Sequence, residues 1–285
     1  MTTLILTALA MLAFAGNSII CRLALASGSI DPASFTMLRV LSGAAMLWLM
    51  MLVHRQRVQG NWPSALALLA YAGFFSAAYM QLSAATGALL LFGAVQVTMI
   101  GYGLSRGERL SGLRLAGFLL AAAGVLYLLL PGLSQPPLVS SLFMLAAGVA
   151  WGIYSLRGKG IANPAAATAG NFIRAALPAI LLWLALAQFT QQKLDGWGWA
   201  VLSGALASGI GYVLWYAALR SLASVTAATV QLSVPPIAAL GGVLLLGEVL
   251  TPRLAICSVV ILGGIALVVL KKKVGVRSAE VGGKS

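Results

Sequence analysis

Apolar stretches of about 20 residues recur along the chain and are separated by short polar breaks. A stretch of that length crosses the hydrocarbon core of a bilayer as one α-helix. The breaks carry turn residues, for example Gly60-Asn61-Trp62-Pro63, Asn163-Pro164 and Thr251-Pro252. The pattern predicts an all-α polytopic membrane protein with ten transmembrane helices. They lie near residues 4–25, 33–53, 63–83, 87–105, 112–131, 138–158, 165–187, 198–219, 225–246 and 253–271.

Composition excludes an ordinary soluble domain. Of the 285 residues, 61% are hydrophobic and 8% are charged, whereas charged residues make up roughly 25% of a typical globular chain. So much apolar surface has to face lipid, and membrane lipid is therefore the first partner that the sequence predicts. The net charge of +13 does not indicate nucleic-acid binding, because the basic residues lie at the ends of apolar runs and not on one soluble face.

The basic residues fall mainly in alternate connecting segments. Thirteen lysines and arginines lie on one side of the predicted membrane and three on the other, with Arg39 and Arg174 inside helices. The positive-inside rule then places both termini in the cytoplasm. Residues 273–285 are basic and lack apolar periodicity, so we expect them to form a disordered cytoplasmic tail.

The chain also repeats itself, with the matching segments in the same order in both halves. Each half holds five predicted helices, which is an odd number, so the second copy enters the membrane from the opposite face. The sequence therefore predicts two inverted five-helix repeats, residues 1–132 and residues 137–272. The matching segments are Arg39–Leu49 with Arg174–Leu184, Tyr79 with Tyr212, and Gly107-Glu108 with Gly247-Glu248.

Two features of these repeats carry a resemblance to a known family. Each half has a Gly-Glu-x-Leu-(Ser/Thr) turn before its last helix, at residues 107–111 and 247–251, and Trp151-Gly152 stands early in the second half. In these features the chain resembles the drug/metabolite transporter superfamily, EamA type. Within that superfamily it looks closest to the bacterial amino-acid exporters of the aromatic amino-acid and paraquat exporter branch.

The resemblance implies a central cavity lined by the first four helices and by the sixth to ninth, with the fifth and tenth helices outside it. It implies a secondary transporter that exports small metabolites, amino acids and aromatic ones among them, across the bacterial inner membrane. It also fits a monomer or weak homodimer. An inverted repeat provides alternating access around a midplane site. A channel-like facilitator, and an exporter of other small organic solutes such as cationic drugs, stay open as alternatives.

Two arginines inside predicted helices, Arg39 and Arg174, are the first candidates for binding residues. A guanidinium in mid-helix costs roughly 2.5–3.5 kcal/mol on insertion scales, and it can hold a substrate carboxylate through paired hydrogen bonds. The alternative is that both bind backbone carbonyls or extend to the interface, because each lies about two turns into its helix.

Aromatic and amide side chains inside the spans are the other candidates. Aromatic rings with polar tips suit amino acids and flat organic cations, although some of them belong to interfacial belts. Amides suit zwitterions because they donate and accept hydrogen bonds, or they join helices. The candidate substrate-binding residues are Asn17, Arg39, Tyr79, Gln81, Gln96, Tyr102, Trp151, Tyr154, Asn171, Arg174, Tyr212, Trp215, Tyr216 and Gln231.

The acidic residues and the single histidine lie outside the middle of the spans. We expect Glu108 and Glu248 to cap the helices that follow them or to meet nearby arginines, and His54 lies in a loop. No carboxylate or imidazole is thus placed to relay protons, and we expect transport without such a relay. Motifs for enzyme chemistry are lacking, so we expect no catalytic activity, no cofactor and no metal site.

Overall fold

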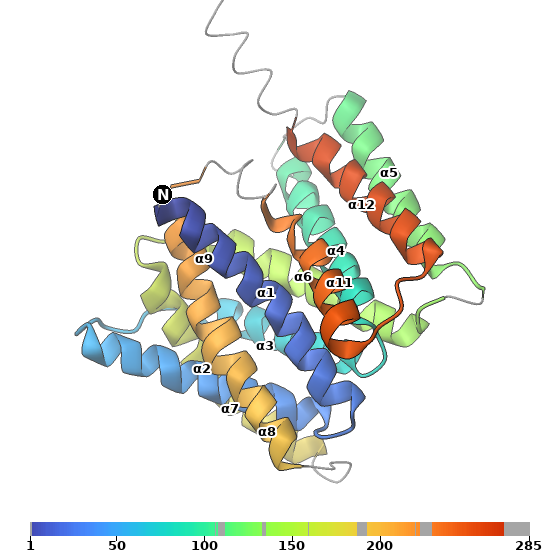
Figure 1. Ribbon diagram of the computed structural model, residues 1–285. Helices are drawn as coiled ribbons and strands as arrows, with labels where there is room; N and C mark the ends of the chain where they lie inside the picture. The colour runs from blue at the N-terminus through green and yellow to red at the C-terminus, as the bar shows by residue number, and fades with distance from the viewer. Residues whose placement is uncertain are drawn as a thin grey trace, which may run out of the picture.

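The computed structural model describes residues 2–105, 107, 112–132, 135–158, 160–186, 193–219, 221–222 and 230–270. Every element in these ranges is a helix (Figure 1). The expected tail at 273–285 and the turn residue Glu108 lie outside them. The elements are α1 Thr2–Ala26, α2 Pro32–Val53, α3 Trp62–Tyr79, α4 Ala84–Ser105, α5 Gly112–Leu129, α6 Leu138–Gly158, α7 Pro164–Leu186, α8 Leu194–Leu202, the π-helix η2 Ser203–Ile210, α9 Gly211–Leu219, α11 Val234–Leu246 and α12 Pro252–Leu270.

Six helical segments of the described chain are long and apolar enough to cross a membrane. Helix α3 and three shorter apolar helices correspond to four further spans that the sequence predicts. The protein is therefore a multi-pass, all-helical membrane protein. The six segments are Thr3–Ala26, Pro32–Val53, Ala84–Ser105, Leu138–Gly158, Pro164–Leu186 and Leu194–Ala218, and the shorter helices are Leu115–Leu129, Val234–Leu246 and Pro252–Leu267.

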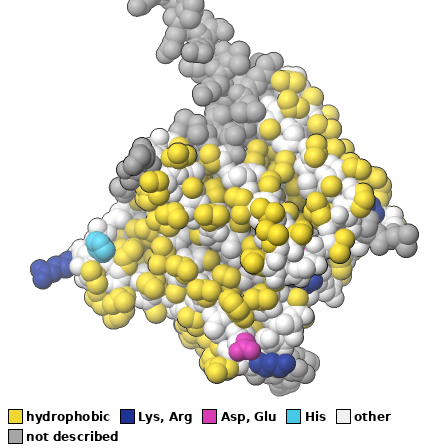
Figure 2. All heavy atoms as spheres, viewed as in Figure 1, with side chains coloured by type: hydrophobic (Ala, Val, Ile, Leu, Met, Phe, Trp, Pro, Cys, Tyr) yellow, Lys and Arg dark blue, Asp and Glu magenta, His cyan; other side chains and the backbone are white. Residues whose placement is uncertain are grey.

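The outer surface is apolar, as a lipid environment requires. Large side chains on several helices are mostly exposed, among them Leu4 at 74%, Val53 at 71% and Val259 at 74%. Figure 2 shows hydrophobic side chains spread over one whole face of the molecule, with charged groups only near its margins. In water these side chains would lose the free energy of apolar burial, so their exposure indicates contact with lipid tails.

Helix α2 begins at a complete N-terminal cap. The Oδ1 atom of Asp31 accepts hydrogen bonds from the backbone N–H groups of Ala33 at 2.9 Å and Ser34 at 3.0 Å. Pro32 occupies the first helical position, where its missing N–H costs nothing. The sequence therefore fixes the start of the helix that carries Arg39.

We expect Asp31→Ala to lower the free energy of unfolding by about 1 kcal/mol, because two N–H groups of α2 lose their acceptor. For a chain of this size that corresponds to a fall in Tm of about 2–4 °C, measured by tryptophan fluorescence of the protein in detergent. Asp195→Ala is the matched control, since it removes an exposed carboxylate from the first turn of α8 without removing a cap. An equal loss in both variants would contradict the assignment of the cap.

Helices α8 and α9 are joined by the π-helix η2, which packs backbone to backbone against α2. A β-carbon built on Gly204 would overlap the Ser42 hydroxyl and the carbonyl oxygen of Arg39. Only glycine permits this approach, as is common where membrane helices touch. A π-turn also changes which side chains face the neighbouring helix, and such segments often occur at functional sites. Here it brings Ser208 to the guanidinium of Arg39.

The remaining helices pack in pairs that join the two halves of the chain. Helix α2 lies against α7, α3 and α4 lie against α6, and α1 lies against α9 and α11. Helices α5 and α12 pack mainly on each other and form one edge of the molecule in Figure 1. The centre is thus enclosed by helices of both halves, with the α5–α12 pair to one side.

Candidate functional site

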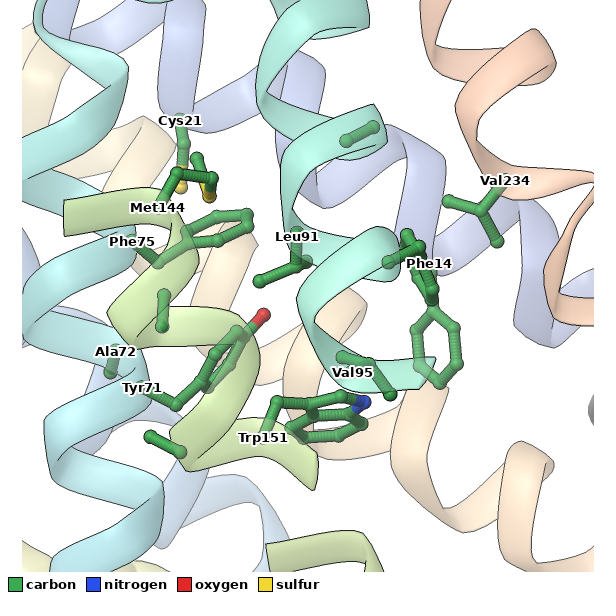
Figure 3. Close-up of a cluster of buried hydrophobic side chains, with 14 of the residues drawn as sticks. Phe14, Cys21, Tyr71, Ala72, Phe75, Leu91, Val95, Met144, Trp151 and Val234 are labelled. Atoms are coloured by element: carbon green, nitrogen blue, oxygen red, sulfur yellow. The ribbon is translucent and has the colours of Figure 1, made fainter. Parts of the chain in front are cut away.

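A cluster of aromatic rings occupies the centre of the bundle. The ring of Trp151 on α6 lies 4.9 Å from that of Tyr71 on α3 and 4.9 Å from that of Tyr212 on α9. Phe14 on α1 makes an edge contact with Trp151 at 6.1 Å. Figure 3 shows Phe14, Tyr71, Phe75 and Trp151 within one buried cluster. Four helices, two from each half, therefore contribute rings to one place.

This cluster surrounds a small cavity of about 20 Å³, which is room for roughly one water molecule. Its wall is mostly aromatic, with an amide and two kinds of hydroxyl groups among the rings. In this structure the cavity has no room for a larger ligand, which needs the helices to separate. The lining residues are Phe14, Asn17, Ser18, Tyr71, Phe75, Leu91, Phe92, Trp151, Ala207 and Tyr212.

Arg39 lies behind this wall and is almost fully buried, with 1% of its surface exposed. Its Nε donates to Ser208 Oγ at 3.0 Å, and its Nη2 donates to the Tyr71 hydroxyl at 3.2 Å. The guanidinium carbon also lies 5.0 Å from the centre of the Tyr71 ring and 5.1 Å from that of Phe75, distances typical of cation–π contacts. Arg39 therefore does not extend to an interface.

The charge of Arg39 has no carboxylate partner in the described part of the chain. The ion pair found there joins Arg22 to Glu248 instead. Among the described residues, the Nη1 atom of Arg39 and the hydroxyl of Tyr212 are both buried without a hydrogen-bond partner. Buried polar groups are nearly always paired, so two unpaired groups beside one cavity require an explanation.

A hydrogen-bonded pair joins α1 to η2 on another side of the cavity. Ser203 Oγ donates to Asn17 Oδ1 at 2.6 Å, and both residues are buried. The Cys21 sulfur lies 4.0 Å from the same serine oxygen. Asn17, a candidate substrate-binding residue, thus joins two helices and also lines the cavity.

Three further candidates lie near the end of α6 and in the first half of α7. Asn171 Oδ1 accepts from the backbone N–H of Asn61 at 3.0 Å, and its Nδ2 donates to the Tyr154 hydroxyl at 3.4 Å. Arg174 Nη1 donates to the carbonyl oxygens of Gln59 and Gly170, each at 2.9 Å. These contacts fix the segment before α3 against α7. For Arg174 they correspond to the alternative in which the guanidinium binds backbone carbonyls.

A larger cavity of about 350 Å³ lies where α2 ends and α7 begins, with His54, Gln56 and Asn163 in its wall. Tyr216 lines this cavity and also a small one of about 10 Å³ that Tyr154 and Asn171 line. The ring of Tyr154 in turn lies 5.6 Å from that of Trp151. Polar and aromatic side chains thus form a continuous series from the end of α2 to the central cavity.

The other candidates are spread more widely. The Tyr79 hydroxyl donates to the Ala84 carbonyl oxygen at 3.4 Å, and the exposed Gln81 accepts from Ser140. Gln81 does not line the central cavity, whereas the Tyr79 ring lies 4.7 Å from that of Phe75, which does. Gln96 is buried in α4, Tyr102 is 45% exposed, Trp215 is buried with its ring 5.9 Å from Phe14, and Gln231 is half-buried before α11.

At the opposite end from the 350 Å³ cavity, one ion pair connects four helix ends. Arg22 Nε at the end of α1 lies 3.1 Å from Glu248 Oε1 in the turn between α11 and α12. Arg22 Nη1 donates to the Met80 carbonyl oxygen at 3.0 Å, just after α3. Glu248 Oε2 accepts from the backbone N–H of Ala84 at 2.9 Å, at the start of α4. The pair closes this end of the bundle.

This arrangement corrects the expectation for Glu248, which neither caps the helix that follows it nor meets Arg253. The cap of α12 is Thr251, whose Oγ1 accepts from the Leu254 N–H at 3.2 Å. Arg253 instead donates to the carbonyl oxygens of Tyr127 and Leu130. The expectation was wrong because α11 ends at Gly247 with φ of +64°, and the chain then turns Glu248 back toward α4.

Several residues of the cavity wall escaped the sequence analysis. Tyr71 and Phe75 stand four residues apart on α3, and Tyr79 follows after four more, so their side chains share one helix face. That spacing was available in the sequence and marks an aromatic stripe. Ser208 could not be found in this way, because its contact with Arg39 depends on the π-helix and on a neighbouring helix.

Residues 138–270 match the EamA-like transporter family. The second half of the chain is therefore similar to that family. A curated protein of Pseudomonas aeruginosa, named "Uncharacterized protein PA1977", is 57% identical over 271 residues, which cover 93% of this chain and 94% of that protein. A solved structure described as "Crystal structure of protein" superposes with a TM-score of 0.64 at 22% identity, covering 93% of this chain and 98% of that one.

The EamA-like match over residues 138–270 indicates a membrane transporter of small solutes. The EamA-like half contributes Trp151 and Tyr212 to the central cavity. Arg39 and Tyr71 come from the first half, to which the likeness in fold also extends. The site therefore needs both halves of the chain.

Proposed function

We propose that the protein is a secondary transporter that exports small metabolites across the bacterial inner membrane by alternating access. The substrate class that we propose is amino acids, aromatic ones among them. The observation that carries this proposal is the central cavity, enclosed by aromatic rings from both halves and backed by the buried guanidinium of Arg39. A wall of this kind suits a solute that has both an apolar body and polar groups.

The transport cycle that we propose uses ten transmembrane helices in two inverted repeats. The packing pattern supports it. If each helix is replaced by its equivalent in the other half, every contact named here becomes another contact that the structure also contains. Helix α2 packs on α7 and α5 on α12, while the contact of α3 with α6 has its counterpart in that of α1 with α8 and α9. The two ends of the bundle would then open in turn around one midplane site.

The orientation follows from the distribution of lysine and arginine and places both termini in the cytoplasm. The end of α2, with the 350 Å³ cavity, then faces the cytoplasm. The end closed by Arg22 and Glu248 faces outward. Such a molecule takes up solute from the cytoplasm before it opens to the outside, as a monomer or weak homodimer.

Of the candidate binding residues, we assign the substrate contacts to those at the central cavity. We assign the access route to the aromatic and amide residues between this cavity and the end of α2. We assign no part in binding to the other candidates. The contacts are Asn17, Arg39, Trp151 and Tyr212, and the route residues are Tyr154, Asn171 and Tyr216.

Counterflow in liposomes tests the proposal. The purified protein is reconstituted, the vesicles are loaded with an unlabelled amino acid, and uptake of the labelled one is followed for phenylalanine, tryptophan, threonine and the cation methyl viologen. We expect saturable exchange of amino acids and no accumulation when a pH gradient alone is imposed. Flux that does not saturate would indicate the channel-like alternative, exchange of methyl viologen alone would indicate the cationic-drug alternative, and strong proton-driven accumulation would contradict transport without a proton relay.

A further inference from the structure

The unpaired groups beside the central cavity are not randomly placed. Among the described residues, buried side-chain nitrogen or oxygen atoms without a hydrogen-bond partner occur on Asp31, Arg39 and Tyr212. The burial of Asp31 is explained by the cap of α2, in which its Oδ1 atom accepts a backbone hydrogen bond. The remaining two groups, a cationic N–H and a neutral O–H, are both donors and both belong to the central cluster.

The Tyr71 hydroxyl adds a third donor. It accepts the hydrogen bond from Arg39 Nη2 at 3.2 Å, so its own proton can point to the neighbouring Tyr212 hydroxyl or to a ligand in the cavity. A hydroxyl that accepts from a guanidinium is polarised and becomes a stronger donor. Tyr71 and Tyr212 both line the cavity, each with its ring 4.9 Å from that of Trp151.

The charge at this place is also one-sided. Arg39 is 1% exposed, and the acids that the structure describes are Asp31, Asp195 and Glu248, of which Glu248 is paired with Arg22. None of the three makes an ion pair with Arg39. A buried cation without a counter-charge is unfavourable in a membrane interior, and an anionic ligand supplies that counter-charge.

We propose that the Tyr71 and Tyr212 hydroxyls, with the guanidinium of Arg39 behind them, form a binding site for the carboxylate of the transported solute. This inference rests on the proposed transport function and deepens it: the solute is recognised through its carboxylate, not through a positive charge. Its apolar body packs on Phe14 and Trp151. A cation is excluded from the cavity because Arg39 repels it.

Three probes with the same ring separate the chemical groups. L-Phenylalanine carries a carboxylate and an ammonium, 3-phenylpropionate carries the carboxylate alone, and phenethylamine carries the ammonium alone. Binding is measured on the full chain in detergent by equilibrium binding and by the shift in Tm. We expect L-phenylalanine and 3-phenylpropionate to bind and to raise Tm, and phenethylamine to do neither. Binding of phenethylamine alone, or of none of the three, overturns the proposal.

Tyr212→Phe is the decisive variant, because its hydroxyl has no partner among the described residues and its ring packing is kept. We expect its Tm without ligand to be unchanged or higher, and its affinity for 3-phenylpropionate to fall about tenfold. Tyr127→Phe on α5, whose side chain is 49% exposed, is the matched control and should bind as the wild type does. Wild-type affinity in Tyr212→Phe overturns the proposal.

Arg39→Gln and Arg39→Lys separate the charge from the hydrogen bonds. We expect Arg39→Gln to lose more than tenfold in affinity for 3-phenylpropionate, and Arg39→Lys to lose less because it keeps the charge. If Arg39→Gln does not fold, Tyr212→Phe still decides the matter. Sodium acetate and sodium chloride complete the test. If chloride raises Tm as much as 3-phenylpropionate does, the site binds a halide, and its assignment to a carboxylate is overturned.

A failed transport assay and a failed binding assay have different meanings. If the liposomes show no exchange of any solute while 3-phenylpropionate binds through Tyr212, the carboxylate site stands and the proposed transport function fails. If amino acids exchange at the same rate in the wild type and in Tyr212→Phe, with unchanged KM, the transport function stands and the carboxylate site fails.

Discussion

Gly204→Ala is expected to yield almost no folded protein. The added β-carbon would overlap the Ser42 hydroxyl and the carbonyl oxygen of Arg39 on α2. Backbone atoms cannot turn aside as a flexible side chain does, so α2 and η2 would have to separate along their contact. We expect a loss of at least about 3 kcal/mol of unfolding free energy. The measurement is the monodisperse fraction on size-exclusion chromatography in detergent, followed by Tm of whatever remains.

Gly198→Ala is the matched control for this change. It lies six residues earlier on α8, and a β-carbon built there meets no atom within 4 Å. Alanine also has the higher helix propensity, by about 1 kcal/mol, so this variant should be as stable as the wild type or more so. If Gly204→Ala were as stable as Gly198→Ala, the close contact of α2 with η2 would be wrong.

Glu248→Gln is expected to open the end of the bundle where α1 terminates. The substitution removes the ion pair with Arg22, at 3.1 Å, whose side chains are 22% and 14% exposed. Glutamine can still accept from the N–H of Ala84, so the cap of α4 is weakened but not lost. At about 1.4 kcal/mol for the lost charge–charge contact, the population open at this end rises about tenfold.

The buried thiol of Cys21 reports this opening. It precedes Arg22 on α1 and is fully buried. With Cys257 replaced by alanine, a bulky hydrophilic thiosulfonate should modify Cys21 about tenfold faster in Glu248→Gln than in the parent protein. Asp195→Asn removes an exposed carboxylate at the same end and should leave the rate unchanged. Arg22→Gln should match Glu248→Gln, and the double variant should add little to either. Equal rates in all variants would exclude a closing role for the pair.

The sequence predicts the helices well because a bilayer imposes a length on each apolar run. The expected span 138–158 coincides with α6, and 33–53 with α2 from its second residue on. The π-helix at Ser203–Ile210 could not be predicted. Its hydrophobic pattern is that of an ordinary helix, and the extra residue in its turns is accommodated by the contact of Gly204 with α2.

Some residues of the candidate site could be selected from the sequence because a bilayer also penalises certain residue types. Arg39, Asn17 and Trp151 are costly or unusual inside a membrane span, so their residue types alone mark them. Arg174 carries the same mark, yet it binds the carbonyl oxygens of Gln59 and Gly170. Sequence gives the residue type and the depth in the helix. It does not show which neighbouring segment approaches the guanidinium, and that approach distinguishes the two arginines.

The contact of Gly204 with α2 also determines which parts of the molecule can move independently. Two backbones in direct contact cannot slide past each other without first separating, so α2 and η2 behave as one rigid body. Arg39 and Ser208 lie on the two members of that body and travel together. Tyr71 and Trp151 stand on α3 and α6, which pack closely on each other. In the transport cycle that we propose, the rings of Tyr71 and Trp151 would then move relative to the guanidinium of Arg39.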